Sequence, residues 1–267
     1  MSHADESTVG ELDGRVALVT GGARGIGRVI AIRLAKAGAA VAVGCRTRQD
    51  AAQTVAEEIR RAGGRACAVC GDLAAPDRPA GIVAEITEAL GSVDLLVHNA
   101  APPRRPSKLL DDSWESFDLH FRAGVHGAWA LAREVVPSMR SAGFGRIVLI
   151  TTTSSRLYVP GFGAYSTAKG AMESFAVYLA AELGSCGITV NVIAPGLTVK
   201  PDSPVTLSPE KQTLFPTGRV PQADDVAEAV LSLVSPAAAG ITGVVLPVDG
   251  GLRLLEPLRG RPPDRET

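Results

Sequence analysis

The sequence predicts a single-domain α/β protein with a doubly wound, seven-stranded parallel sheet, and two observations predict it. Short apolar runs alternate along the chain with longer stretches of helical periodicity. The first of these runs, at residues 15–20, ends directly at glycines, which is typical of a strand buried on both faces. Strand–helix alternation with right-handed crossovers then gives the doubly wound arrangement.

Each apolar run corresponds to one expected strand of this Rossmann fold. The strands are expected at residues 15–20, 39–45, 66–70, 93–97, 146–152, 188–193 and 244–248. Glycines close several of the intervening helices, as is common at helix C-termini. The helices are expected at about 25–37, 50–62, 77–90, 113–142, 165–184 and 223–234. Proline-rich loops are expected at 101–112 and 200–221.

Composition limits the domain count and the classes of partner. The chain has 267 residues, 46% of them hydrophobic, and a net charge of -1, which suits one large domain at residues 13–252. A substrate loop is expected at about 197–221, with a flexible N-terminus at 1–12 and a C-terminal tail at 253–267. The charge balance indicates no nucleic-acid partner, and no apolar run suits a membrane span or a signal peptide. We therefore expect a cytoplasmic protein.

The four cysteines do not indicate a metal or redox site. Cys67 and Cys70 have the C-x-x-C form, but they fall within an expected strand rather than at a helix N-terminus that would stabilise a thiolate. The pair offers too few ligands for a metal. We interpret both as small apolar core residues and expect no metal.

Two short patterns carry the chemistry. Residues 20–27, Thr-Gly-Gly-Ala-Arg-Gly-Ile-Gly, join the first strand to the first helix, where a pyrophosphate can approach the backbone and the helix N-terminus. Tyr165 and Lys169 lie one helical turn apart and therefore share a face. An ammonium beside a phenol lowers the pKa of the phenol, which suits a proton donor to a carbonyl. Alone, the Tyr-x-x-x-Lys spacing is only weak evidence for a catalytic site. It becomes stronger evidence because a glycine turn suited to a dinucleotide precedes it.

Together these patterns resemble the short-chain dehydrogenase/reductase family, and within it the 3-oxoacyl-carrier-protein reductase-like branch, over about residues 13–252. Four further motifs follow in the family's order. They are Asp72-Leu73, similar to the pair that meets the adenine; residues 98–101, similar to Asn-Asn-Ala-Gly; residues 191–196, similar to the turn beside the nicotinamide; and Asp249-Gly-Gly near the C-terminus.

The resemblance implies a set of cofactor contacts spread over these motifs. They are Gly21, Arg24, Gly25, Ile26, Gly27, Arg46, Asp72, Leu73, Asn99, Ala100, Tyr165, Lys169, Pro195, Gly196 and Thr198. The second strand ends without the acidic residue that would bond a ribose 2′-hydroxyl, and Arg46 with Arg24 can clamp a 2′-phosphate. NADPH (NADP) is therefore the expected cofactor, and two solvated surface arginines are the alternative.

The resemblance also implies a catalytic mechanism. Tyr165 is expected to protonate a carbonyl oxygen as hydride arrives, and Lys169 to hold the nicotinamide ribose. The family's serine, about 13 residues upstream of the tyrosine, corresponds by counting to Thr152, whose hydroxyl can orient the substrate oxygen. A slip of one or two positions would give Thr153 or Ser154 instead.

Several positions depart from the family pattern. Gly124 stands where an asparagine usually anchors a relay water, and neither His120 nor His126 is an obvious substitute. His98 and Ala101 replace the first Asn and the Gly of the Asn-Asn-Ala-Gly motif. Lys200 stands where a threonine often follows the Pro-Gly turn. These departures put the proton relay in doubt, but not the fold.

Three functions remain open for the chain. An NADPH-dependent carbonyl reductase comes first, followed by a redox-neutral enzyme such as an isomerase or cyclase, and a non-catalytic NADP(H)-binding protein. The substrate is expected to be a small carbonyl compound, either free or carrier-bound. Its pocket is expected to include Pro102, Arg104, Arg156, Leu157, Tyr158, Phe162 and Leu197. Arg104 and Arg105 could face an anion, although a solvated loop is the simpler interpretation. A homotetramer or homodimer is implied by the resemblance.

Overall fold

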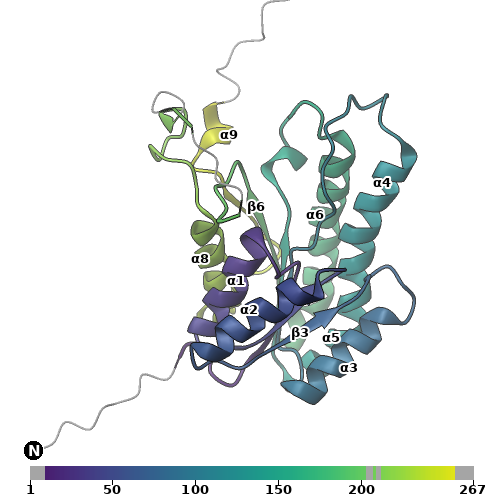
Figure 1. Ribbon diagram of the computed structural model, residues 1–267, viewed down its shortest axis with the longest axis vertical. Helices are drawn as coiled ribbons and strands as arrows, with labels where there is room; N and C mark the ends of the chain where they lie inside the picture. The colour runs from purple at the N-terminus through teal and green to yellow at the C-terminus, as the bar shows by residue number, and fades with distance from the viewer. Residues whose placement is uncertain (1–9, 203–206, 209–211, 256–267) are drawn as a thin grey trace, which may run out of the picture.

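Seven parallel strands form the centre of the computed structural model, which describes residues 10–202, 207–208 and 212–255 (Figure 1). The strands are β1 (Val16–Thr20), β2 (Ala40–Cys45), β3 (Ala66–Cys70), β4 (Leu95–His98), β5 (Gly145–Ile150), β6 (Ile188–Pro195) and β7 (Val245–Val248). Their order in the sheet is β3-β2-β1-β4-β5-β6-β7, and every neighbouring pair is parallel. The predicted doubly wound sheet is confirmed.

Helices cover both faces of the sheet. They are α1 (Gly25–Lys36), α2 (Gln49–Arg61), α3 (Arg78–Ala89), α4 (Trp114–Phe121), α5 (Gly127–Ala142), α6 (Gly163–Leu183), α8 (Ala223–Val234) and the short α9 (Leu252–Leu255). In Figure 1, α1, α2 and α8 lie on one side of the strands, and α3, α5 and α6 lie on the other. Among the described residues, no helix is long and apolar enough to cross a membrane.

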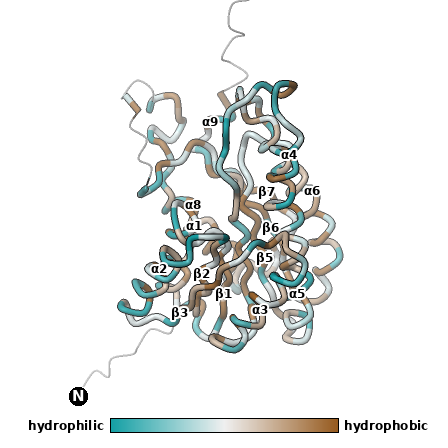
Figure 2. Tube along the Cα trace, turned by 45° about the vertical axis from the view of Figure 1, so that its right-hand side comes forward, coloured by the Kyte–Doolittle hydropathy of each residue, from teal (hydrophilic) through white to brown (hydrophobic). Residues whose placement is uncertain are grey.

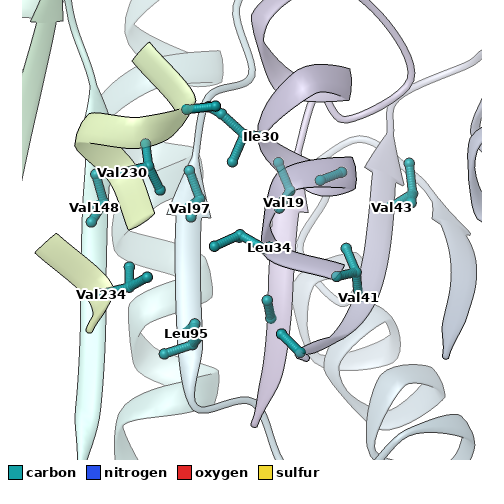
Figure 3. Packing of buried hydrophobic residues seen from close by; sticks show 14 of the residues in the cluster. Val19, Ile30, Leu34, Val41, Val43, Leu95, Val97, Val148, Val230 and Val234 are labelled. Atoms are coloured by element: carbon teal, nitrogen blue, oxygen red, sulfur yellow. The ribbon is translucent and has the colours of Figure 1, made fainter. Parts of the chain in front are cut away.

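Two apolar clusters hold these layers together. In the first, Ile30 and Leu34 of α1 and Val230 of α8 pack on Val19 and Val97 of the sheet (Figure 3). Alternate residues of the same strands, such as Leu18 of β1, face the second cluster under α3, α5 and α6. Both faces of the sheet are therefore covered, which explains why its strands are mostly apolar. Figure 2 shows them as the brown centre of the molecule.

The expected elements differ from the observed ones mainly at the long helix. The stretch expected at 113–142 is interrupted by a π-helical turn, Arg122–His126, between α4 and α5. The fifth strand ends at Ile150, so Thr151 and Thr152 lie beyond it. The short helix α9 was not predicted, because a single helical turn leaves no periodic pattern.

The expected domain limits fall partly on residues outside the described ranges. Of the N-terminal segment 1–12, residues 10–12 are described, and Leu12 is fully buried. Leu12 therefore belongs to the packed core, one residue before the expected domain limit. Residues 256–267 of the expected C-terminal tail, and 203–206 and 209–211 of the substrate loop, lie outside the described residues.

Candidate active site

The carboxyl ends of β1 to β4 border a pocket of about 260 Å³. It is lined by the glycine turn, by the ends of β2 and β3, and by the residues after β4. In open parallel sheets this crevice, where neighbouring crossovers run in opposite directions, is the usual ligand site. Of the expected cofactor residues, the pocket is lined by Gly21, Arg24, Arg46, Asp72, Leu73 and Ala100.

The glycine turn is shaped by close backbone contacts. Gly21 has a φ of 64°, a left-handed conformation that favours glycine. A Cβ at Gly27 would overlap the Gly21 carbonyl oxygen, so only glycine lets α1 begin this close to the turn. Asn99 donates from Nδ2 to the Thr20 carbonyl at 3.1 Å and to the Gly21 carbonyl at 3.3 Å. Asn99 therefore holds the turn, whatever contact it makes with a ligand.

The N-terminus of α1 is open to an anion. Its N-cap residue, Arg24, makes no side-chain cap hydrogen bond, and the first turn holds no acidic residue. The first backbone N–H groups, from Gly25 to Gly27, are left for another acceptor. Among the described residues, Arg24 and Arg46 form no ion pair, and both line the pocket. The turn, the open helix end and two unpaired cations fit the phosphates of a dinucleotide.

Tyr165 and Lys169 lie on one face of α6, as their spacing predicted, and Thr152 lies against the tyrosine. The Thr152 hydroxyl lies near enough to the Tyr165 phenol to favour its ionised form, which lowers its pKa. Thr152 also caps the turn Thr153–Ser155, and its Oγ1 lies 3.1 Å from Ser154 Oγ. Of the three hydroxyls that counting left open, the structure brings that of Thr152 to the tyrosine.

Burial dominates the charge states of this pair. The pKa of Lys169 is lowered to about 7, first by burial and then by the positive charge of Arg104. Lys169 Nζ donates to the Ile150 carbonyl at 2.7 Å. Burial raises the pKa of Tyr165, and outweighs the lowering caused by Arg104 and by the Thr152 hydroxyl. Arg104 is the cation that lowers the pKa of Tyr165 here, and the expected effect of Lys169 on that pKa stays a prediction.

The last of the expected cofactor residues, Pro195, Gly196 and Thr198, lie in the turn after β6. Pro195 ends β6, and the Gly196 N–H donates to the Val248 carbonyl at 3.0 Å. A Cβ at Gly196 would lie 2.7 Å from Cβ of Asp249, so this turn packs directly on the Asp-Gly-Gly motif. The buried Thr198 donates to the Gly196 carbonyl at 3.0 Å. All the expected motifs thus lie along the carboxyl edge of the sheet.

Comparison with known proteins agrees with this arrangement. A family model described as enoyl-(acyl carrier protein) reductase matches residues 21–253. An uncharacterised oxidoreductase of Mycobacterium tuberculosis is 38% identical, over 90% of this chain and 93% of its own length. The 3-oxoacyl-[acyl-carrier-protein] reductase of Pseudomonas aeruginosa is 34% identical, over 90% of this chain and 98% of its own.

Among solved structures, a gluconate 5-dehydrogenase of Burkholderia cenocepacia, in complex with NADP and tartrate, superposes with a TM-score of 0.83 at 31% identity. The match covers 91% of this chain and 96% of that one. The chain belongs to the short-chain dehydrogenase/reductase family. Within it, the chain is similar to the 3-oxoacyl-carrier-protein reductase branch, as its motifs indicated.

His98, which replaces the first asparagine of a family motif, ties two parts of the site together. Its ring is fully buried, with Nδ1 3.2 Å from Thr20 Oγ1 and Nε2 3.0 Å from the Ala123 carbonyl. Burial, then the charge of Lys169, lowers the pKa of His98 to about 4, so the imidazole is neutral. A neutral ring that donates from Nε2 and accepts at Nδ1 satisfies both contacts. His98 thus connects β1 to the π-helical turn.

Gly124 lies in the π-helical turn, where the family usually has an asparagine. A Cβ at Gly124 would lie 3.0 Å from Met172 Sδ of α6, so little room is left for a side chain. Gly124 lines a small cavity with His120, Tyr165 and Lys169. The ring of His120 is buried and lies 5.5 Å, edge-on, from the ring of Tyr165. Burial, then the charge of Lys169, lowers the pKa of His120.

Sequence reasoning missed one residue at the site, Glu173, and the ring contact of another, Arg104. Glu173, also on α6, is buried and accepts hydrogen bonds from Thr151 at 3.2 Å, Ser155 at 2.6 Å and Arg156 at 2.8 Å. It therefore fixes the segment that carries Thr152. Arg104 lies with its guanidinium 5.0 Å from the centre of the Tyr165 ring. Its place in an Arg-rich loop was a signal for charge, but not for contact with the tyrosine.

Lys200 lies between the cofactor turn and Arg104, close enough to each to be affected by the charges of Arg24 and Arg104. Its Cδ would be 3.7 Å from a Cβ placed on Gly25, so it stands beside the N-terminus of α1. Burial, then the charge of Arg104, lowers the pKa of Lys200. The family's threonine is thus replaced by a cation next to the expected pyrophosphate position. Among the described residues, no group of three or more potential ligands suits a metal ion.

Proposed function

We propose that this protein is an NADPH-dependent reductase of a carbonyl group, of ketone or 3-oxoacyl type, with Tyr165 as the proton donor. The observation that carries the proposal is that the Thr152 hydroxyl and the Tyr165 phenol meet, and that Tyr165 shares a small cavity with Ala100, which also lines the dinucleotide pocket. A bound nicotinamide supplies the hydride. A carbonyl oxygen between the two hydroxyls would accept hydrogen bonds from both, and would take its proton from the phenol.

The charge states support the reductive direction. Because burial raises the pKa of Tyr165, the phenol keeps its proton at neutral pH. Lys169, with a pKa of about 7, is partly charged there, and we assign it to the nicotinamide ribose. The neutral His98 and the network around Glu173 hold the surrounding backbone in place.

The proposed preference for NADPH rests on the pocket near β2. Arg46 and Arg24 line it without an acidic partner among the described residues, and a guanidinium binds phosphate through paired hydrogen bonds. The structure of the Burkholderia cenocepacia gluconate 5-dehydrogenase in complex with NADP is consistent with this choice.

The test is oxidation of NADPH, with NADH in parallel, against a panel of ketones and 3-oxoacyl esters. The proposal expects turnover with at least one compound and a preference for NADPH. Tight NADPH binding without turnover on any carbonyl would favour a binding protein. Turnover of a substrate without net NADPH oxidation would favour a redox-neutral enzyme.

Assembly and location are proposed alongside this function. Val177 and Tyr178 of α6 are 51% and 69% exposed, and Trp129 of α5 is 43% exposed. Such apolar residues on neighbouring helices suit burial against a second copy. We propose a homotetramer or homodimer in the cytoplasm, and light scattering of the purified protein tests the assembly.

A further inference from the structure

Arg104 lies close to two aromatic rings, one of which is that of Tyr165. Its guanidinium carbon lies 5.0 Å from the centre of the Tyr165 ring and 5.2 Å from that of Phe162. Phe162 is tied to the same loop, because residues Ser107 and Phe162 form an isolated parallel bridge. The two rings therefore place one cation close to the phenol that we assign as the proton donor.

Contacts with aromatic faces leave the hydrogen-bonding edge of a guanidinium available. An arginine carries five N–H donors in its plane, and stacking on a ring uses the face instead. Among the described residues, no hydrogen bond or ion pair involves the Arg104 side chain. Arg156 is different, because its Nε donates to Glu173 at 2.8 Å. The N–H donors of the Arg104 guanidinium are thus available to a ligand, whereas Arg156 already donates to Glu173.

The charges around Arg104 also favour an anion. Its nearest charged neighbours within the site include Lys169 and Lys200, and the positive charge of Arg104 lowers the pKa of each. Glu173, the buried carboxylate nearest to Thr152, is already bonded by three side chains. Two carboxylates without an ion pair among the described residues act nearby, Asp112 on His120 and Asp202 on Lys200, but the pKa of each partner is still lowered, so positive charge outweighs negative charge. An anionic group on the substrate would therefore enter a region of net positive potential.

We propose that Arg104 binds the carboxylate of a small oxo acid whose ketone lies between Thr152 and Tyr165. This inference rests on the proposed reductase function. A carboxylate matches the planar fork through two parallel hydrogen bonds, and the closeness of Arg104 to the Tyr165 ring suits an α- or β-keto acid. In the reaction the ketone carbon gains a hydride and its oxygen gains the Tyr165 proton. The products are the hydroxy acid and NADP⁺, and the carboxylate is unchanged.

Matched pairs of acid and ester test this assignment by turnover. Steady-state NADPH oxidation is measured with acetoacetate against methyl acetoacetate, and with benzoylformate against methyl benzoylformate. We expect kcat/KM to favour each acid by at least about tenfold, the size of one charged hydrogen-bonded contact. Arg104→Gln should abolish this preference, and Arg104→Lys should retain part of it. Arg105→Gln, in the same exposed loop but without a ring contact among the described residues, should keep it.

Binding of an unreactive analogue separates this proposal from the reductase function. Calorimetry on the NADPH-loaded protein compares oxamate, a carboxylate, with its ethyl ester. A preference for oxamate that Arg104→Gln removes supports the anion site even if no ketone turns over. Turnover of the esters as fast as the acids, or an acid preference that survives Arg104→Gln, would overturn it and leave the reductase function standing.

Discussion

The cofactor half and the catalytic half of this site depend on different parts of the chain, the backbone in one and the side chains in the other. The cofactor half, around β1 to β3, depends on backbone: glycines at Gly21 and Gly27, strand ends and an uncapped helix. The catalytic half, between the π-helical turn and α6, depends on buried side chains that contact one another across the fold. A backbone requirement can be recognised in the sequence from glycines at one turn, whereas contacts between side chains far apart in the sequence cannot.

If the cofactor half depends on backbone contacts, adding a single methyl group to one of its glycines should lower both stability and NADPH affinity. Gly27→Ala should overlap the Gly21 carbonyl and cost at least about 3 kcal/mol of unfolding free energy, at the upper end for overpacking. NADPH affinity should fall with it, as measured by fluorescence titration and urea unfolding. Gly184→Ala, where a Cβ meets nothing within 4 Å, is the matched control and should change neither quantity. Normal NADPH binding by Gly27→Ala would show that the turn does not require glycine at this position.

In the catalytic half, the buried His98 should make the free energy of unfolding depend on pH. The pKa of His98 is about 4 in the folded protein and 6.5 ordinarily, so between these values the unfolded chain binds more protons. The free energy of unfolding should therefore fall as the pH falls through this window, by about 3 kcal/mol. His98→Asn should remove most of this loss in urea unfolding at several pH values. A His126→Asn control should retain it, and an unchanged pH profile in His98→Asn would contradict the assignment.

A charge reversal in the cofactor half should change the choice of cofactor and leave the chemistry intact. Arg46→Asp should weaken NADPH relative to NADH by about 10- to 100-fold, because a phosphate contact becomes a repulsion. The ratio of kcat/KM for the two cofactors measures this effect. Arg61→Asp, on the exposed side of α2 and paired only with Glu57, is the control. An unchanged ratio in Arg46→Asp would refute the phosphate contact.

The smallest expected effect concerns a residue that acts through others. Glu173→Gln keeps the shape but loses the charge that accepts from Ser155 and Arg156. We expect kcat to fall roughly tenfold, as the segment carrying Thr152 loosens, with the KM for NADPH unchanged. Glu182→Gln, an exposed glutamate at the end of α6, is the control. Equal losses in kcat and NADPH affinity would instead indicate general damage.

The same contrast explains what the sequence could predict. The strands and helices followed from apolar periodicity, and the cofactor turn followed from glycines at one strand end. His98 bonds a carbonyl 25 residues away, Arg104 lies over a ring from another element, and Glu173 joins a loop 17 to 22 residues earlier. These contacts exist only once the chain has folded. The π-helical turn likewise has no simple periodic pattern, and it placed Gly124 beside Lys169.

Tyr165→Phe tests the division between binding and chemistry most directly. The variant keeps the ring that contacts His120 and Arg104, and removes only the phenol hydroxyl beside Thr152. We predict an NADPH dissociation constant within about threefold of the wild type, and a single-turnover rate of ketone reduction lowered by about 10²- to 10⁴-fold. Reduction at the wild-type rate by this variant would contradict the assignment of Tyr165 as the proton donor.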